Sequence, residues 1–571
     1  MGNIFHEAMR ILDKTSKLFY HSKMSVSVVQ KSLQKEMFPI SVKNKHLLTI
    51  TEASIWASNH LGKNVTTSNI SYLIQYGRVQ KFEKEGIVFI SVAELNDYYK
   101  SYNGSREIVY KEKLGNNLNW ALSFDQYKEA ETTKHVHRLH PYKGKFIPQL
   151  VEYFLDSHTD SFKKEVYFNA GDIILDPFSG SGTTMVQAAE LDMNAIGIDI
   201  SEFNSIIGNS KIKKYDINEI QLEVNRITNI LLSYVKKSNI MQFEENLLSE
   251  LAIFNGKYFP VPDYKYKLRR KEINEEKYAP EKEKMFLPIY YSLVEKYKIK
   301  TKQTKNNSFL DKWYFPQVRA EIELVYSEIN KIANNDLRNI FLIMLSRTMR
   351  SCRATTHADL ATLLEPVTEA YYCSKHGKIC KPLFSILKWW KTYTKDTIER
   401  LQYFSKLRTQ TEQLCLVGDS RTINIFNEVN IINPSFGKIL KKNKIAGIFS
   451  SPPYVGLIDY HEQHAYAYDL FKFTRNDELE IGPLFRGKGI AARNSYIEGI
   501  SSVLLNCKKY LVDDYNVFLV ANDKFNMYPT IAEKSGMTIV QQFHRPVLNR
   551  TERDQAAYSE TIFHMKEKND G

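Results

Sequence analysis

The stretch that decides the fold is Asp172–Ser201, DIILDPFSGSGTTMVQAAELDMNAIGIDIS. Its run Ile173–Leu175 is short and apolar, which is typical of a buried strand. Gly180 and Gly182 allow a tight turn and a close approach of the backbone to a ligand, and a helix with an apolar stripe follows. A second apolar run, Ala195–Ile198, predicts another strand. Strand, glycine turn, helix and strand in this order predict an α/β fold with a ligand site at the turn.

Two acidic residues stand where these strands end. Asp176 lies beside the glycines, and this placement suits a cationic or amine-bearing ligand better than a pyrophosphate. The turn has no Gly-Lys-Ser/Thr sequence, which disfavours a phosphate-binding loop. Asp199 follows Asp176 by 23 positions, and an acid at the end of the second strand suits the diol of a ribose.

A second segment, Ala446–Phe471, has the sequence AGIFSSPPYVGLIDYHEQHAYAYDLF. Its strand-like start runs directly into Ser451, Pro452, Pro453 and Tyr454. The two prolines fix the backbone and lack N–H groups, so carbonyl oxygens of this turn can be presented as free acceptors. An exocyclic base amine needs such acceptors, because its conjugated lone pair makes it a poor nucleophile until the nitrogen becomes pyramidal. Tyr454 can stack on a base that has left the duplex, which is worth roughly 1–3 kcal/mol.

The composition agrees with a folded protein that binds a polyanion. The chain has 571 residues, which predicts about three or four structural units, and 43% of them are hydrophobic. Lys and Arg number 78 against 65 Asp and Glu, giving a net charge of +13. Five Cys exclude a disulfide-rich scaffold and fit a reducing compartment, and no secretory signal or membrane span is visible. We therefore expect a cytoplasmic protein.

Together these segments resemble the S-adenosylmethionine-dependent amino methyltransferases of DNA. DPFSGSGTT is similar to the cofactor loop of that family, and HPYKGKFIPQLVEYFL, His140–Leu155, resembles the motif that closes over the methionine part of the cofactor. LCLVGDSR, Leu414–Arg421, resembles the segment whose acid contacts the adenine amine. The resemblance implies S-adenosylmethionine as the cofactor and a Rossmann-like class I methyltransferase sheet. The cofactor-binding residues that it implies are Lys145, Phe146, Pro148, Asp176, Pro177, Phe178, Gly180, Gly182, Thr183, Asp199, Ile200 and Asp419.

The resemblance also implies the reaction. Ser-Pro-Pro-Tyr resembles the catalytic motif of the N4-cytosine enzymes, which assigns catalysis to Ser451, Pro452, Pro453 and Tyr454 and implies double-stranded DNA as the substrate. A bacterial or archaeal restriction-modification system, with a cognate restriction endonuclease as partner, is then expected. Cytosine-C5 methylation is disfavoured, because it needs a nucleophilic Cys, usually after a Pro, and no Cys of this chain follows a Pro.

Three alternatives stay open from the sequence. Adenine-N6 methylation of DNA is the nearest, because some enzymes with Ser at the first motif position modify adenine. A tRNA guanine-N2 methyltransferase also pairs such a glycine loop with Pro-Pro-Tyr. A DNA-binding regulator with an inactive methyltransferase fold is a third, although both core motifs are intact.

The sequence divides into four predicted regions. Residues 1–118 are predicted to form a DNA-binding domain like a helix-turn-helix, and residues 119–209 the cofactor-binding part of the methyltransferase domain. Residues 210–413 form a mainly helical insertion, the expected target-recognition region, and residues 414–571 complete the catalytic part. This motif order resembles the α arrangement of the family, but the insertion falls before the third strand, whereas the family usually has it after that strand.

The first region has the rhythm of a helix, turn, helix and small wing, which resembles a winged helix-turn-helix of the excisionase type. Thr51 is predicted to cap the first helix, and Thr66 or Thr67 to start the second. The candidate DNA contacts in this region are Ser68, Asn69, Ser71, Tyr72 and Arg78.

Further candidate DNA contacts lie downstream. Arg347, Arg350 and Arg353 have spacings of three, which place them near one helical face, where they could meet phosphates or guanine edges. Arg545 and Arg550 belong to a segment that looks like the terminal hairpin of the family, beside the target base.

A cysteine-rich segment, YYCSKHGKICKP, contains Cys373, His376 and Cys380, and Cys352 could be a fourth zinc ligand. Because this spacing is not that of a standard finger, we assign no metal from the sequence, and buried thiols in a loop are the alternative.

Overall fold

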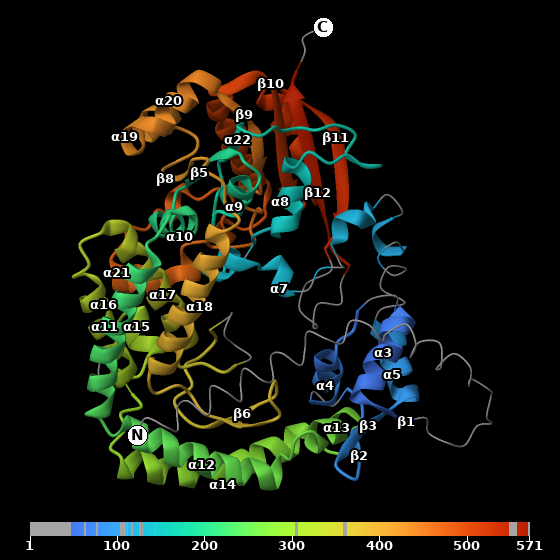
Figure 1. Cartoon of the computed structure of the whole chain (residues 1–571), viewed down its shortest axis with the longest axis vertical. Helices are drawn as coiled ribbons and strands as arrows, with labels where there is room; N and C mark the ends of the chain where they lie inside the picture. Colours follow the sequence, from blue (N-terminus) through green and yellow to red (C-terminus); the bar gives the residue numbers. More distant parts are fainter. Residues whose placement is uncertain are drawn as a thin grey trace, which may run out of the picture.

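The computed structural model describes residues 47–568 except for 62–63, 76–77, 103–109, 111, 116–117, 125–126, 128, 143, 303–306, 358–362 and 548–556. Figure 1 shows a twisted sheet at one end, a group of helices below it, and, at the lower right, a small unit formed by residues 47–102 beside those helices. No helix in the described part of the chain is long and apolar enough to cross a membrane.

The large sheet has seven strands in the order β11-β12-β10-β9-β4-β5-β8. Five of them are parallel: β4 (Ile173–Asp176), β5 (Asn194–Asp199), β8 (Gln413–Val417), β9 (Ile445–Ser450) and β10 (Leu511–Ala521). The hairpin of β11 (Met537–Pro546) and β12 (Ser559–Glu567) adds to the edge, where β12 is antiparallel to β10. This mixed sheet fits the predicted Rossmann-like fold, and every strand expected in these segments is present.

Helices cover both faces of the sheet, because alternate strand residues point to opposite sides. Ile174 and Ala195 join the buried cluster that includes α8 (Pro148–Leu155), α9 (Thr183–Glu190) and α10 (Glu202–Ile212). Ile173 and Ile196 join the cluster on the other face. That face packs against α19 (Ile425–Ile432), α20 (Pro434–Asn443), α22 (Ile490–Lys508) and α23 (Tyr528–Lys534).

The segment between α10 and β8 is mainly helical. It contains α11 (Ile217–Lys236), α12 (Ile240–Tyr258), α13 (Asp263–Arg269), α14 (Glu275–Lys296), α15 (Phe309–Trp313), α16 (Pro316–Ile329), α17 (Asn335–Ser351), α18 (Leu387–Ser405) and the hairpin of β6 (Tyr371–Cys373) and β7 (Lys378–Cys380). Most of its buried apolar side chains belong to the same buried cluster as α8, α9 and α10, so the insertion shares a core with one face of the sheet, while Tyr371, Cys373 and Cys380 of the hairpin form a small cluster of their own. In Figure 1, α12 and α14 run together along the lower edge toward the small unit of residues 47–102 at the lower right.

That small unit has the predicted helix order. It comprises β1 (Leu47–Thr49), α3 (Ile50–Leu61), α4 (Thr67–Gln75), β2 (Phe82–Lys84), β3 (Ile87–Ser91) and α5 (Val92–Tyr102), with an antiparallel sheet in the order β1-β3-β2. Thr49, not Thr51, caps α3: the Thr49 N–H donates to Glu52 at 2.9 Å, and the Glu52 N–H donates to the Thr49 hydroxyl at 3.3 Å. Thr66 and Asn69 make the same reciprocal bonds at the start of α4.

A long connection follows strand β9. Between β9 and α22 lie a short helix, α21 (Ala465–Phe471), and three 3-10 turns, η3 (Glu462–His464), η4 (Asp477–Leu479) and η5 (Leu484–Arg486). The segment before α8 holds η1 (Trp120–Ser123), α7 (Glu129–Thr132) and η2 (His135–Arg138).

Candidate active site

A cavity lies at the carboxyl ends of β4, β5, β8 and β9. The chain leaves β4 toward β5 and leaves β9 toward β10, in opposite directions along the sheet, so the boundary between β4 and β9 is a topological switch point where ligands of open α/β sheets bind. The cavity encloses about 880 Å³, including space open to solvent. Ten of the twelve predicted cofactor-binding residues line it: Lys145, Phe146, Asp176, Pro177, Phe178, Gly180, Thr183, Asp199, Ile200 and Asp419.

The glycine turn forms the floor between β4 and α9. Gly180 and Gly182 have φ of +50° and +75°, a backbone conformation that other residues rarely adopt. A Cβ atom on Gly182 would lie 2.9 Å from the Met185 methyl and 3.0 Å from the Gly208 Cα atom. A Cβ atom on Gly180 would lie 3.1 Å from the ring of Tyr142, a cavity residue. Gly182 therefore shapes the turn without lining the cavity.

Asp199 is the acid at the end of β5, and the backbone of the site holds it in place. One carboxylate oxygen accepts the Gly180 N–H at 2.9 Å. The other accepts the Ser201 N–H at 2.8 Å and the Asn204 side-chain amide at 3.1 Å. Burial raises the pKa of Asp199 to about 6, because these hydrogen bonds only partly offset the loss of water. These three donors use three of the roughly four lone-pair positions of the carboxylate, so one position stays open, on the oxygen that accepts the Gly180 N–H, for a hydroxyl such as that of a ribose.

Asp176 is the acid at the end of β4, and it is 2% exposed. It accepts hydrogen bonds from the Ser450 hydroxyl at 2.5 Å and the Phe178 N–H at 3.3 Å. Burial raises its pKa to about 6. No Lys or Arg of the described residues forms an ion pair with it, so a cationic ligand in the cavity would stabilise its ionised form. These residues fit a ligand that carries a ribose and a positive charge.

The segment before α8 closes another side of the cavity. The Lys145 ammonium donates to the His137 carbonyl at 2.8 Å, and burial lowers the pKa of Lys145 to about 8. The Phe146 ring packs edge-on against Phe449 of β9, with the ring centroids 5.5 Å apart. Pro148 is the first residue of α8 and does not line the cavity, so it fixes where the helix begins.

Asp419 follows β8 and lines the cavity, but its carboxylate has a partner within the chain. The Arg421 guanidinium donates to both oxygens of Asp419, with distances from 2.6 to 3.0 Å. Arg421 also donates to the Leu479 carbonyl at 3.2 Å. The pKa of Asp419 lies below its ordinary value: burial raises it, and the bonds from Arg421 more than offset that effect.

The turn Ser451-Pro452-Pro453-Tyr454 follows β9 and borders the same cavity. Ser451 and Pro453 line the cavity, and Pro452 is buried. The Ser451 hydroxyl donates to the Val520 carbonyl at the end of β10, at 3.2 Å. Because its proton is used in this bond, the Ser451 oxygen presents lone pairs.

Tyr454 is held by the carboxyl-terminal hairpin. Its hydroxyl donates to Glu560 of β12 at 2.9 Å, and Glu560 lies 3.4 Å from the Arg545 guanidinium of β11. Arg545 and Glu560 are paired across the hairpin. Arg545 was predicted to contact DNA, but it is 4% exposed, and its guanidinium lies 5.9 Å from the centre of the Phe124 ring. The structure thus places Arg545 behind Tyr454, and Arg550 lies outside the described residues.

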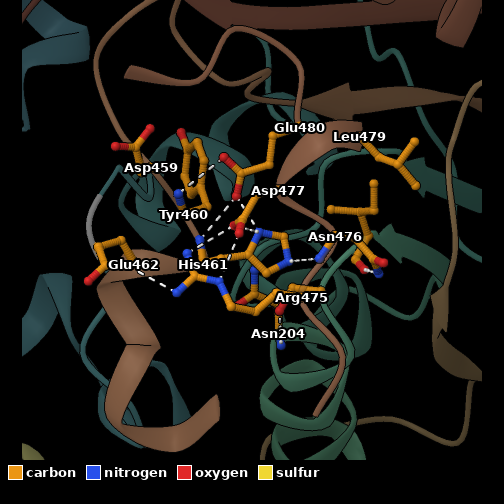
Figure 2. Close-up of polar contacts among 12 residues, drawn as sticks. Asn204, Asp459, Tyr460, His461, Glu462, Arg475, Asn476, Asp477, Leu479 and Glu480 are labelled. Atoms are coloured by element: carbon orange, nitrogen blue, oxygen red, sulfur yellow. Dashed lines mark hydrogen bonds and ion pairs between the residues drawn. The ribbon is translucent and has the colours of Figure 1, made fainter. Parts of the chain in front are cut away.

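Sequence reasoning did not single out the loop after this turn, which lines the cavity with Tyr460, His461 and Glu480 and whose polar contacts are drawn in Figure 2. The Tyr460 and His461 N–H groups both donate to the buried Glu480 carboxylate, at 3.4 and 3.0 Å, and the His461 ring also bonds to Glu480. The Asn476 N–H donates to the far nitrogen of that ring at 3.3 Å, and the Asn476 side chain donates to the Ile200 carbonyl at 3.3 Å. This network ties the loop to the strand end that carries Asp199.

The three spaced arginines do not form one exposed row. The Arg347 side chain is 6% exposed, donates to Asp396 of α18 at 2.7 Å and lies over the Tyr393 ring. Arg353 is 5% exposed, follows the end of α17 and lies 5.7 Å from the centre of the Tyr466 ring. Arg350 is half-buried. A spacing of three residues could not show that α17 is surrounded by other helices.

The candidate contacts near the amino terminus do face outward. Ser68, Asn69 and Ser71 are exposed on α4, Tyr72 is 45% exposed, and Arg78 is half-buried just beyond the helix. Their contact with DNA stays a prediction.

Comparison with known proteins identifies the family. A family model described as DNA methylase, of the N6/N4 class, matches residues 1–210. The type II methyltransferase M.MjaII of Methanocaldococcus jannaschii is 47% identical over 526 residues, which are 91% of this chain and 97% of that protein. The chain belongs to the DNA methylase family. DNA methylases of the N4/N6 class use S-adenosylmethionine as methyl donor, and this chain therefore has that cofactor.

Two further relatives match shorter parts of this DNA methylase. The type II methyltransferase M.BsoBI of Geobacillus stearothermophilus is 31% identical over 125 residues, 21% of this chain and 23% of that protein. The type II methyltransferase M.MvaI of Kocuria varians is 21% identical over 248 residues, 43% of this chain and 41% of that protein. Each of these two matches covers less than half of either protein, so the family assignment rests on the match to M.MjaII.

Proposed function

We propose that this DNA methylase transfers a methyl group to the N4 amine of cytosine in double-stranded DNA, at a specific site, as part of a type II restriction-modification system. The observation that carries the proposal is the placement of Ser451-Pro452-Pro453-Tyr454. This turn follows the central strand β9 and borders the cavity that holds Asp176 and Asp199.

Ser451 and Pro452 are proposed to accept the N–H bonds of the target amine. The Ser451 oxygen is a suitable acceptor, because its own proton is directed to the Val520 carbonyl. Neither proline has a backbone N–H that could compete. Accepting both N–H bonds favours a pyramidal nitrogen, whose lone pair is no longer shared with the ring. Preorganised acceptors of this kind lower the barrier without moving during the reaction.

Tyr454 is proposed to stack on the flipped cytosine. Its hydroxyl is fixed by Glu560, and Glu560 is fixed by Arg545, so the ring is held from behind by the terminal hairpin. The family resemblance implies that this hairpin lies beside the target base, and we propose that Arg545 positions Tyr454 there through Glu560.

The cofactor is proposed to sit with its ribose at Asp199 and its methionine ammonium toward Asp176. S-adenosylmethionine, when bound, supplies an electrophilic methyl group on a positively charged sulfur. The carboxylates fit it, because Asp199 is preorganised by three donors and Asp176 is buried without a cation of the described residues. The loop that carries His461 and Glu480 then excludes water from the ribose side.

We further propose that residues 1–118 form a winged helix-turn-helix-like DNA-binding domain and that residues 210–413 carry target recognition, between the two parts of the methyltransferase domain, 119–209 and 414–571. α4 presents exposed polar side chains, as a helix entering a groove requires. The Tyr266 hydroxyl of α13, a short basic helix of the insertion, donates to Gln80 at 2.9 Å, which joins the insertion to the small unit of residues 47–102. A cognate restriction endonuclease would cut the same site when it is unmethylated.

The test is to express the chain in a host without its own DNA methylases and to digest the genomic DNA to nucleosides for mass spectrometry. N4-methylcytosine in one short sequence motif is the expected result, and N6-methyladenine would replace the proposed base with adenine. Ser451→Ala should abolish methylation while the purified protein still binds S-adenosylmethionine. Full methylation by Ser451→Ala would contradict the assigned role of the turn.

A further inference from the structure

A second cluster of reactive side chains lies in the helical insertion, far along the chain from the catalytic turn. One ligand atom from each of His357, Cys373, His376 and Cys380 lies within 4.8 Å of the others. Three of these residues belong to the β6–β7 hairpin and its turn, and His357 follows the end of α17. Cys352, which the sequence offered as the fourth ligand, is not in the cluster, because it is buried against the last turn of α17.

The distances fit a tetrahedral ion. The His376 Nδ1 atom lies 3.5 Å from the Cys373 sulfur and 3.4 Å from the Cys380 sulfur. Zinc binds sulfur at about 2.3 Å and imidazole nitrogen at about 2.0–2.1 Å, so tetrahedral geometry separates such a pair of ligand atoms by about 3.5 Å. We propose that His357, Cys373, His376 and Cys380 form a structural Cys₂His₂ zinc site.

Contacts around the cluster orient its ligands. The Tyr371 hydroxyl lies 2.8 Å from Nδ1 of His357 and accepts the His357 backbone N–H at 3.1 Å. Zinc-binding histidines usually have their second ring nitrogen hydrogen-bonded, and Tyr371 supplies such a partner while Nε2 binds the ion. The cysteines are 2% and 8% exposed, which protects the thiolates, and a closed set of four protein ligands leaves no position for substrate.

The hairpin needs such support. Each of its strands has three residues, and a two-stranded hairpin of this length is marginal on its own. Tyr372 and Ile379 pack against the helices, and polar bonds add to this: Asn255 of α12 exchanges two hydrogen bonds with Ile379, each of 2.9 Å, and the Lys265 ammonium of α13 donates to the Lys375 carbonyl at 2.8 Å. An ion held by His357 and the hairpin would tie the end of α17 to the helices that reach the unit near the amino terminus. This inference does not depend on which base is methylated.

The test begins with the full-length protein, expressed without a histidine tag and purified without chelators. Elemental mass spectrometry should find about one zinc ion per chain. After replacement by Co²⁺, the spectrum should show the visible bands of a tetrahedral ion together with a sulfur-to-cobalt charge-transfer band. That band separates this cluster from His135, His137 and Glu190 and from His461, Asp477 and Glu480, two other groups that contain no Cys. Zinc below about half an ion per chain, with no such Co²⁺ spectrum, would overturn the proposal.

Variants identify the ligands. Cys373→Ser and His357→Asn should each lose the zinc, or bind Co²⁺ with a changed spectrum. Cys352→Ser is the matched control, because it removes a buried thiol from the same region, and it should keep about one zinc ion. Equal zinc loss from Cys352→Ser and Cys373→Ser would refute the ligand assignment. A Cys373–Cys380 disulfide, found by peptide mass spectrometry after protective alkylation, would refute it too.

Discussion

Cofactor binding should weaken steeply as the pH falls through 6, because the two carboxylates of the site have raised pKa values. Burial raises the pKa of Asp176 and of Asp199 to about 6, from an ordinary value near 4. A ribose diol donates to a carboxylate, and an ammonium attracts one, so the ligand prefers both groups ionised. Binding therefore releases protons when the pH is near or below 6 and strengthens as the pH rises through that value.

The size of the effect follows from the two pKa values. At pH 5 a carboxyl group with a pKa of about 6 is ionised in about one molecule in eleven, whereas at pH 7 it is ionised in about ten of eleven. If the ligand requires both ionised groups, the Kd for S-adenosylmethionine rises by about 100-fold between pH 7 and pH 5. The amine and carboxyl groups of the ligand keep their charges between pH 5 and pH 7, so the change in Kd comes from the protein's own carboxyl groups.

Isothermal titration calorimetry from pH 5 to pH 8 measures this dependence, and titrations in two buffers of different ionisation enthalpy count the protons released. Close to two protons are expected at pH 5 from the wild type and about one from Asp199→Asn. Circular dichroism at each pH provides the control that the protein stays folded. A Kd that changes by less than about threefold between pH 7 and pH 5 would refute the reasoning. So would the release of two protons on cofactor binding by Asp199→Asn at pH 5.

Three further results are expected. Tyr454→Ala should lower kcat/KM by about 5- to 150-fold, the equivalent of about 1–3 kcal/mol of lost stacking, while Tyr454→Phe keeps the ring and most of the activity; equal losses in methylation assays would contradict a stacking role. Gly182→Ala should destabilise the protein by at least about 1–2 kcal/mol in urea unfolding, because its φ is +75°, and an unchanged midpoint would show that the turn tolerates a side chain. Arg347→Ala should cost about 3 kcal/mol, near the low end for breaking a buried ion pair, because Arg400 keeps Asp396 paired. For Arg347→Ala, the slope of the logarithm of DNA affinity against the logarithm of salt concentration should equal that of the wild type. A shallower slope in the variant would instead indicate that Arg347 contacts a phosphate.

The parts of the fold that the sequence predicted are those set by local chemistry. Ile173–Leu175 and Ala195–Ile198 are apolar runs between polar residues, and both are strands of the sheet. The glycines between them have positive φ, as the tight turn required. The Pro-Pro turn was placed correctly at a strand end, because prolines cannot continue a ladder.

The parts that the sequence did not reveal depend on long-range packing. Arg347 lies in α17, whose residues are buried on all sides, so no apolar stripe marks its solvent face. Its partner Asp396 stands on another helix, 49 positions away. His357 meets the hairpin cysteines only because the chain turns after α17, whereas the sequence favoured Cys352 by its residue type.

The loop of His461 and Glu480 joins the proposed catalytic turn to the proposed cofactor site. This loop leaves Ser451–Tyr454, returns across the cavity, and bonds through Asn476 to the Ile200 carbonyl beside Asp199. On the opposite side, the Ser450 hydroxyl next to the turn bonds to Asp176. Strand β9 is therefore bonded directly to the Asp176 carboxylate through Ser450, and the loop that follows it is bonded to the backbone next to Asp199. A change in the ionisation of Asp176 or Asp199 should therefore alter the hydrogen bonds that position the proposed catalytic turn. The boundary between β4 and β9 brings these contacts together, because the ends of both strands border the same cavity.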